Sequence, residues 1–77
     1  MSIKVQYFAS LKELTNHSDL EVAFTQPVTV VNLWSQINPD VPLPENILVA
    51  INMDYAQLSD LIQDGDEVAF FPPVTGG

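Results

Sequence analysis

The sequence predicts a single small α+β domain in which one main helix packs against a mixed β-sheet. Apolar residues alternate with period two near both ends of the chain, which is typical of strands. Between them, residues 30–37 place their apolar side chains at helical spacing. The hydrophobic residues make up 47% of the chain, which is enough to form one core. The length of 77 residues is too short for two domains. We therefore expect one domain over residues 1–77, with residues 71–77 as an extended C-terminal tail.

The N-terminal part is predicted to contain two strands. Residues 3–8 alternate between two faces, and Phe8 falls on the face opposite to Val5 and Tyr7. Residues 20–24 alternate in the same way. The interval between the two strands is too long for a tight hairpin, so a short element is expected between them.

That element is predicted to be a short helix over residues 11–15. Ser10 and Glu13 have the spacing of a capping box. In such a box the Ser10 hydroxyl accepts a hydrogen bond from the Glu13 N–H, and the Glu13 carboxylate accepts one from the Ser10 N–H.

The main helix is predicted over residues 30–37. Thr29 is the expected N-cap, and Pro39 disfavours helical geometry at the preceding residue, so the helix should end there. Its β-branched start has mediocre helix propensity, so the helix needs packing on the sheet to persist. The apolar face consists of Val30, Leu33, Trp34 and Ile37.

The C-terminal part is predicted to contain a surface loop and further strands. Residues 39–45 hold three prolines and read as a loop, and the continuous apolar run 47–51 is typical of a covered central strand. A turn at residues 52–54 should lead to a short edge strand near Tyr55 and then to an irregular turn. Residues 64–66, Asp-Gly-Asp, predict a tight turn before a last strand over 67–71.

This element order is compatible with a ubiquitin-like β-grasp if the first and last strands are parallel neighbours. The alternation does not determine that pairing. In this arrangement Phe8 and Phe71 would form an exposed aromatic patch at the root of the tail, which suggests a protein interface. The alternative is that the twist of the sheet or the tail itself covers these two rings.

The formal net charge is −8, from 10 acidic and 2 basic residues. Such a domain repels a phosphate backbone and an anionic membrane surface, so we expect neither nucleic acid nor membrane as a partner. The start of the chain lacks the pattern of a secretory signal, so we expect a cytoplasmic protein. A protein partner with a basic surface fits the charge.

Few side chains could carry catalysis. The chain has no cysteine and one histidine, so neither a zinc cluster nor an oriented Ser–His triad is expected, and His17 reads as a solvated loop residue. The acidic residues 60–67 lack the spacing of a calcium loop and are interpreted as turn and surface residues. We therefore expect no metal and no cofactor bound by this chain.

The C-terminal segment after Phe71 is the unusual feature. Pro72 and Pro73 have no N–H and end the sheet pairing, and the six residues after Phe71 can reach about 20 Å. Gly76 and Gly77 can thread a narrow channel. A terminal carboxylate reacts only after activation, which nothing in this sequence provides. The segment is therefore either a frayed end or a carrier tail that another protein activates.

Residues 64–77 look like the C-terminal signature of the small subunit of molybdopterin synthase, the MoaD-type sulfur carriers. They read DGDEVAFFPPVTGG. Further stretches resemble the same family in the same order: residues 3–5, 8–9, 12–14 and 49–52. The resemblance covers almost the whole chain, and its last fourteen residues are the most specific part.

The resemblance implies a β-grasp fold and a sulfur-carrier function. It implies that an E1-like enzyme uses ATP to adenylate Gly77, and that the adenylate becomes a thiocarboxylate. The tail, including Gly76, would then enter the large subunit, in an expected heterotetramer, and deliver sulfur to precursor Z to form the dithiolene of molybdopterin. Lys12 stands where the family often has an arginine, so arginine's bidentate geometry does not carry over. The expected partner-binding residues are Phe8, Lys12, Tyr55, Phe71, Pro72, Pro73, Val74 and Thr75.

Three other functions stay open. A β-grasp carrier could serve another pathway of the thiamine type, or a ubiquitin-like modifier could be joined to lysines. A plain acidic interaction module is the third. On the carrier hypothesis the chain is a non-catalytic subunit of a transferase complex.

Overall fold

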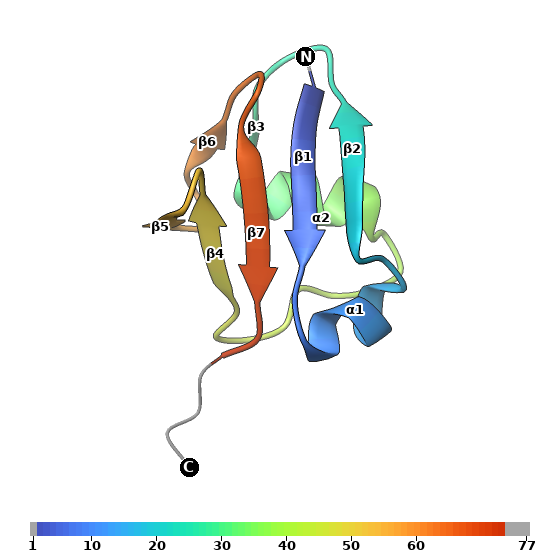
Figure 1. Cartoon of the computed structure of the whole chain (residues 1–77). Coiled ribbons are helices and arrows are strands. Elements are labelled where there is room, and N and C mark those ends of the chain that lie inside the picture. The colour runs from blue at the N-terminus through green and yellow to red at the C-terminus, as the bar shows by residue number, and fades with distance from the viewer. Residues whose placement is uncertain (1, 74–77) are drawn as a thin grey trace.

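The computed structural model describes residues 2–73 as one mixed sheet with a helix across one face (Figure 1). The five-stranded sheet has the order β2-β1-β7-β4-β5, and two short strands form a second sheet, β3-β6. Met1 and residues 74–77 lie outside the described part of the chain. The elements are β1 (Ser2–Tyr7), α1 (Ser10–Thr15), β2 (Asp19–Ala23), β3 (Val28–Thr29), α2 (Val30–Ile37), β4 (Leu48–Ile51), β5 (Asp54–Ala56), β6 (Leu61–Ile62) and β7 (Glu67–Phe71).

The first and last strands lie side by side at the centre of the sheet and run parallel. Their register pairs Lys4 with Glu67 and Tyr7 with Phe70, whereas β1–β2, β4–β7 and β4–β5 are antiparallel. This parallel pairing is what the alternation alone left open. The β-grasp prediction is confirmed.

Helix α2 covers one face of the sheet and closes the core (Figure 1). It spans residues 30–37 as predicted, and the Thr29 hydroxyl oxygen accepts a hydrogen bond from the Asn32 N–H at 3.3 Å, as expected of an N-cap. Val30, Leu33 and Trp34 are buried against the inward side chains of β1 and β7. The Trp34 indole N–H donates to the Val41 carbonyl at 2.8 Å, which ties the loop after α2 to the core.

A buried polar pair lies at the end of β1. Tyr7 is 1% exposed, and its hydroxyl oxygen accepts a hydrogen bond at 3.0 Å from the Asn38 side-chain amide, itself buried. The Tyr7 ring stacks on Phe70, with centroids 5.5 Å apart, and meets Trp34 edge-on at 5.8 Å. Burial raises the pKa of Tyr7, and the hydrogen bond from Asn38 offsets part of that rise.

The predicted capping box at Ser10 is wrong. Helix α1 begins at Ser10 itself, its N-cap is Ala9 with φ 54°, and no side chain caps it. The chain already turns at Phe8, whose carbonyl accepts from the Leu11 N–H at 3.1 Å, and the Ala9 carbonyl accepts from the Lys12 N–H. Ser10 therefore lies inside the first turn, where its hydroxyl does not precede the helix.

The small sheet β3-β6 was not predicted. The residues before α2 were expected only to cap it, and the segment after Tyr55 was expected to be irregular. Instead Val28 pairs with Ile62 and Thr29 with Leu61, and Val28 and Ile62 are buried. This sheet closes the end of the core next to the start of α2.

Two turns agree with the sequence prediction. Gly65 has φ 85° in the turn before β7, a conformation that glycine adopts at little cost. Asn52 and Met53 form the two-residue turn of the β4–β5 hairpin, with φ 52° and 73°. Positive φ at both positions is the geometry of a type I′ turn, which matches the twist of the flanking strands.

Candidate functional site

The face of the sheet opposite α2 presents a small apolar patch. Alternation along the strands buries Val68 and Phe70 and turns Glu67, Ala69 and Phe71 to the other face. The parallel pairing of β1 with β7 and the antiparallel pairing of β4 with β7 bring side chains of three strands onto this face. Its residues line a groove of about 320 Å³: Gln6, Phe8, Ala50, Met53, Tyr55, Glu67, Ala69 and Phe71.

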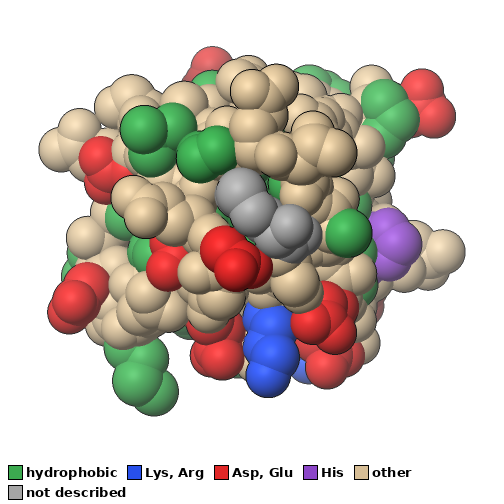
Figure 2. All heavy atoms as spheres, turned by 90° about the horizontal axis from the view of Figure 1, so that it is seen from above, with side chains coloured by type: hydrophobic (Ala, Val, Ile, Leu, Met, Phe, Trp, Pro, Cys, Tyr) green, Lys and Arg blue, Asp and Glu red, His purple; other side chains and the backbone are tan. Residues whose placement is uncertain are grey.

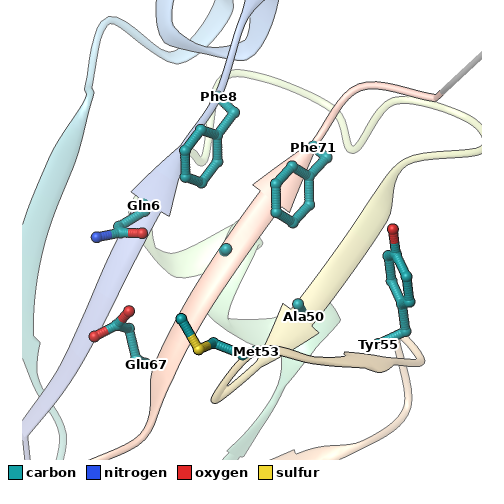
Figure 3. Close-up of a pocket in the computed structure, with 8 residues that line it drawn as sticks. Gln6, Phe8, Ala50, Met53, Tyr55, Glu67 and Phe71 are labelled. Atoms are coloured by element: carbon teal, nitrogen blue, oxygen red, sulfur yellow. The ribbon is translucent and has the colours of Figure 1, made fainter.

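The rings of Phe8 and Phe71 stack on each other at one end of this groove. Their centroids are 4.8 Å apart and the planes differ by 9° (Figure 3). Phe8 remains 38% exposed, and Phe71 is partly buried. The Phe8 N–H donates to the Phe70 carbonyl at 3.1 Å, so the pair is held by backbone as well as ring contact. The aromatic pair expected from the alternation is thus present, with Phe8 exposed and Phe71 partly buried.

Two alanines form the floor of the groove. Ala50 of β4 and Ala69 of β7 are paired across the sheet, and Gln6 lies opposite Ala69 on β1. Their small side chains leave a hollow between the larger residues around it. Tyr55, which is 79% exposed, borders the hollow from the edge strand β5 (Figure 3).

Lys12 lies next to the patch but outside the groove. It projects from α1 and lines a neighbouring shallow hollow together with Gln6, Phe8 and Asp19. The structure therefore brings together four of the residues that the sequence indicated as partner-binding: Phe8, Lys12, Tyr55 and Phe71. Whether they bind a partner remains a prediction.

The root of the tail lies at the end of the groove where Phe8 and Phe71 stack. Pro72 and Pro73 follow Phe71 directly and line a shallow apolar surface with Leu11, Leu14 and Pro44. Both prolines lie outside the sheet, as their missing N–H groups predict. Val74, Thr75, Gly76 and Gly77 lie outside the described residues.

The acidic residues near the last turn have local structural roles. Asp66 accepts a hydrogen bond from the Gln63 N–H at 2.8 Å, and Asp64 accepts one from the Ser2 N–H at 2.8 Å. Asp60 accepts from the Gln57 N–H at 2.9 Å. Within residues 2–73, no group of three or more histidine, cysteine or acidic side chains could hold a metal ion.

Acidic side chains are spread over the end of the molecule opposite the tail, where Figure 2 shows a lysine among them. The net charge of the chain is −8, and a partner with basic groups stays an expectation from the sequence. None of the helices formed by residues 2–73 is both long and apolar enough to cross a membrane.

Sequence reasoning named three residues of the groove, Phe8, Tyr55 and Phe71, and missed the other five: Gln6, Ala50, Met53, Glu67 and Ala69. Gln6 and Glu67 share the outward face with Phe8 and Phe71, so the same alternation could have identified them. Met53 had no such signal, because its position depends on the geometry of the β4–β5 turn.

Comparisons with known proteins point to one family. The ThiS family model matches residues 5–77. The molybdopterin synthase sulfur carrier subunit of Escherichia coli is 37% identical, over 97% of this chain and 99% of that protein.

Solved structures share the fold. SAMP1 from Haloferax volcanii is 29% identical with a TM-score of 0.77, and the match covers 100% of both chains. A protein–protein complex of subunits 1 and 2 of molybdopterin-converting factor from Helicobacter pylori contains a chain with the same fold, at 22% identity, a TM-score of 0.66 and 100% coverage of both chains. The whole-length match to the family model, together with the β-grasp topology, shows that this chain belongs to the ThiS family.

Proposed function

We propose that this protein is the sulfur-carrier subunit of a molybdopterin synthase. The observation that carries the proposal is the whole-length similarity to the sulfur carrier subunit of Escherichia coli. The geometry supports it, because an exposed aromatic pair lies at the root of a segment that ends in two glycines. A patch of that kind suits docking on a larger subunit, and the glycines suit entry of the tail into a narrow site.

The chemistry of the proposal uses the carboxylate of Gly77 and no side chain of this chain. An E1-like enzyme joins the carboxylate to the adenylyl group of ATP and releases pyrophosphate. A sulfur nucleophile then displaces AMP, which carries away one carboxyl oxygen, and a thiocarboxylate remains. The thiocarboxylate sulfur then bonds to precursor Z, and water cleaves the bond between this sulfur and the Gly77 carbonyl carbon, which leaves the sulfur on the substrate and restores the carboxylate. The absence of cysteine agrees with this scheme, because the sulfur is carried on the backbone carboxyl group.

The side chains of this protein would then act in docking. Phe8, Phe71 and Tyr55 supply apolar contact to the large subunit, and Lys12 a single charged contact beside it. Pro72 and Pro73 end the sheet pairing after Phe71 and restrict the start of the tail to extended backbone. In this proposal the patch determines where the large subunit docks, and the tail determines which site of that subunit Gly77 can enter.

Intact-mass measurement tests the carrier step. The protein is incubated with the activating enzyme, ATP and a sulfur donor, and the expected product has one oxygen replaced by sulfur at Gly77. Matched controls are a variant lacking Gly77 and a variant with one extra residue after it, both of which should stay folded and unmodified. An unchanged mass of the wild type under conditions that modify an authentic carrier would refute the proposal.

Two further measurements separate the alternatives. Conversion of precursor Z by the thiocarboxylate form together with the large subunit supports the molybdopterin pathway, whereas consumption only by a thiazole-forming enzyme indicates the thiamine type. An isopeptide remnant of Gly77 on lysines of other proteins would indicate a modifier instead.

A further inference from the structure

The β4–β5 turn presents an exposed methionine in a costly backbone conformation. Met53 has φ 73° and is 94% exposed. The second position of such a turn is usually glycine, because a side chain at positive φ is strained. The Met53 side chain is not among the residues of the protein's own core. The Met53 side chain therefore adds no core packing that would offset this strain, and strained sites of this kind are often functional.

The turn is fixed to the adjacent strand rather than loose. The Asn52 N–H donates to the Glu67 carbonyl at 2.8 Å, and the Glu67 N–H donates to the Asn52 side-chain oxygen at 3.0 Å. The Asn52 side-chain amide also donates to Asp66 at 3.0 Å. These three hydrogen bonds tie the turn to the start of β7. The backbone at Met53 is consequently held in place, and Figure 3 shows the Met53 side chain directed from the turn over strand β7.

The hollow beside Met53 has a volume of about 320 Å³ and a mostly apolar lining. Ala50 and Ala69 form its floor, and Phe71 and Tyr55 stand at its border. Phe71 is also the last strand residue before the tail, so the groove adjoins the root of the tail that the proposed partner would hold. Glu67, on the groove lining, favours a basic group of the partner next to the apolar contact.

We propose that the large subunit inserts one bulky apolar side chain into the hollow over Ala50 and Ala69, and that Met53 packs onto it. This inference rests on the proposed function. An unbranched thioether side chain adapts to an irregular surface, which suits a contact formed only in the complex. Met53 thus costs stability in the free protein and contributes to affinity in the complex.

The test measures the Kd for the large subunit of molybdopterin synthase and, in parallel, the urea midpoint of the free protein. Met53→Ala keeps the backbone strain and removes the contact, so the Kd should rise about fivefold or more. Met53→Gly should weaken binding as much while raising the urea midpoint, because it relieves the strain. A residue with a merely structural role would not separate the two readouts in this way.

Two further variants complete the design. Ala69→Leu fills the hollow and should weaken binding about tenfold or more, corresponding to at least one lost apolar contact. Leu61→Ala is the matched control, because Leu61 is 59% exposed on β6, outside the groove, and its Kd should stay within about twofold of the wild type.

The outcomes distinguish this inference from the proposed function. If the wild-type protein does not bind the large subunit, the proposed function itself is wrong. If it binds, and the Met53 variants bind equally well, the inference is overturned while the function stands. Circular dichroism of each variant establishes that it is folded, and the two Met53 variants decide the matter if Ala69→Leu does not fold.

Discussion

Alanine substitution of the neighbouring residues Phe70 and Phe71 should affect different properties: mainly the stability of the fold for Phe70, and mainly the affinity for the partner for Phe71. Phe70 points into the core with 0% exposure and contacts Tyr7 and Trp34 at centroid distances of 5.5 and 5.2 Å. Phe71 points to the outer face and stacks on Phe8 at 4.8 Å. Replacing either ring removes the same atoms, so the pair separates the requirements of folding from those of docking.

The magnitudes follow from burial. Phe70→Ala should lower the free energy of unfolding by about 3–5 kcal/mol, the usual effect for a fully buried phenylalanine. The whole domain of 77 residues should have a stability of about 4–12 kcal/mol, so this variant loses from about a quarter to all of it. Phe71→Ala loses one stacked contact and partial burial, about 1–2 kcal/mol. Its Kd for the large subunit should rise about 30-fold, equivalent to about 2 kcal/mol.

Urea denaturation followed by the fluorescence of Trp34, the one tryptophan in the chain, measures the stabilities. Titration calorimetry with the large subunit measures the affinities of the folded variants. Equal destabilisation by the two substitutions would refute the assignment of the two faces. An unchanged affinity for Phe71→Ala would refute the docking role of the aromatic pair.

Three further predictions concern the free protein and its charge. Because burial raises the Tyr7 pKa above its ordinary value of 10.0, the unfolded chain releases this proton first. The contribution of Tyr7 to stability should therefore be constant below about pH 10 and fall above it, by up to about 1.4 kcal/mol per pH unit, until the pH reaches the pKa of Tyr7 in the folded protein. Tyr7→Phe should remove this part of the slope in urea titrations. Gly65→Ala should lower the free energy of unfolding by about 1 kcal/mol, and with it the Tm, because alanine at φ 85° is strained. The effect should be no larger, because no atom lies within 4 Å of the added Cβ. An unchanged Tm would contradict the strain argument. The association rate with the large subunit should fall as salt increases, measured by stopped flow, and a rate that ignores salt would mean that the charge serves solubility.

Much of the fold follows from local pattern. The alternation in residues 67–71 places Val68 and Phe70 inside and Phe71 outside, because successive side chains of a strand point to opposite faces. The helical spacing identifies α2, and the N-cap at Thr29 and Pro39 after Asn38 define its two ends. The turn residues around Gly65 likewise act through their own backbone preferences.

Other features depended on partners that are distant in the chain. The start of α1 moved to Ser10 because the chain turns directly after β1, where Phe8 is held by the Phe70 carbonyl. The strands β3 and β6 are only two residues each, too short for a periodic pattern, and form because each supplies the other's hydrogen bonds. Met53 could not be identified as part of the groove without the turn that presents it.

The sequence by itself determined the composition of the two faces, the main helix and the unusual C-terminal segment. It also supplied the family resemblance, which the comparisons confirmed. Only the tertiary structure decided that β1 and β7 lie parallel and adjacent, which brings Phe8 and Phe71 into contact from opposite ends of the chain. The physical reason is that alternation records which way a side chain points, whereas strand pairing depends on the packing of the whole core and on closing a loop of almost the entire chain.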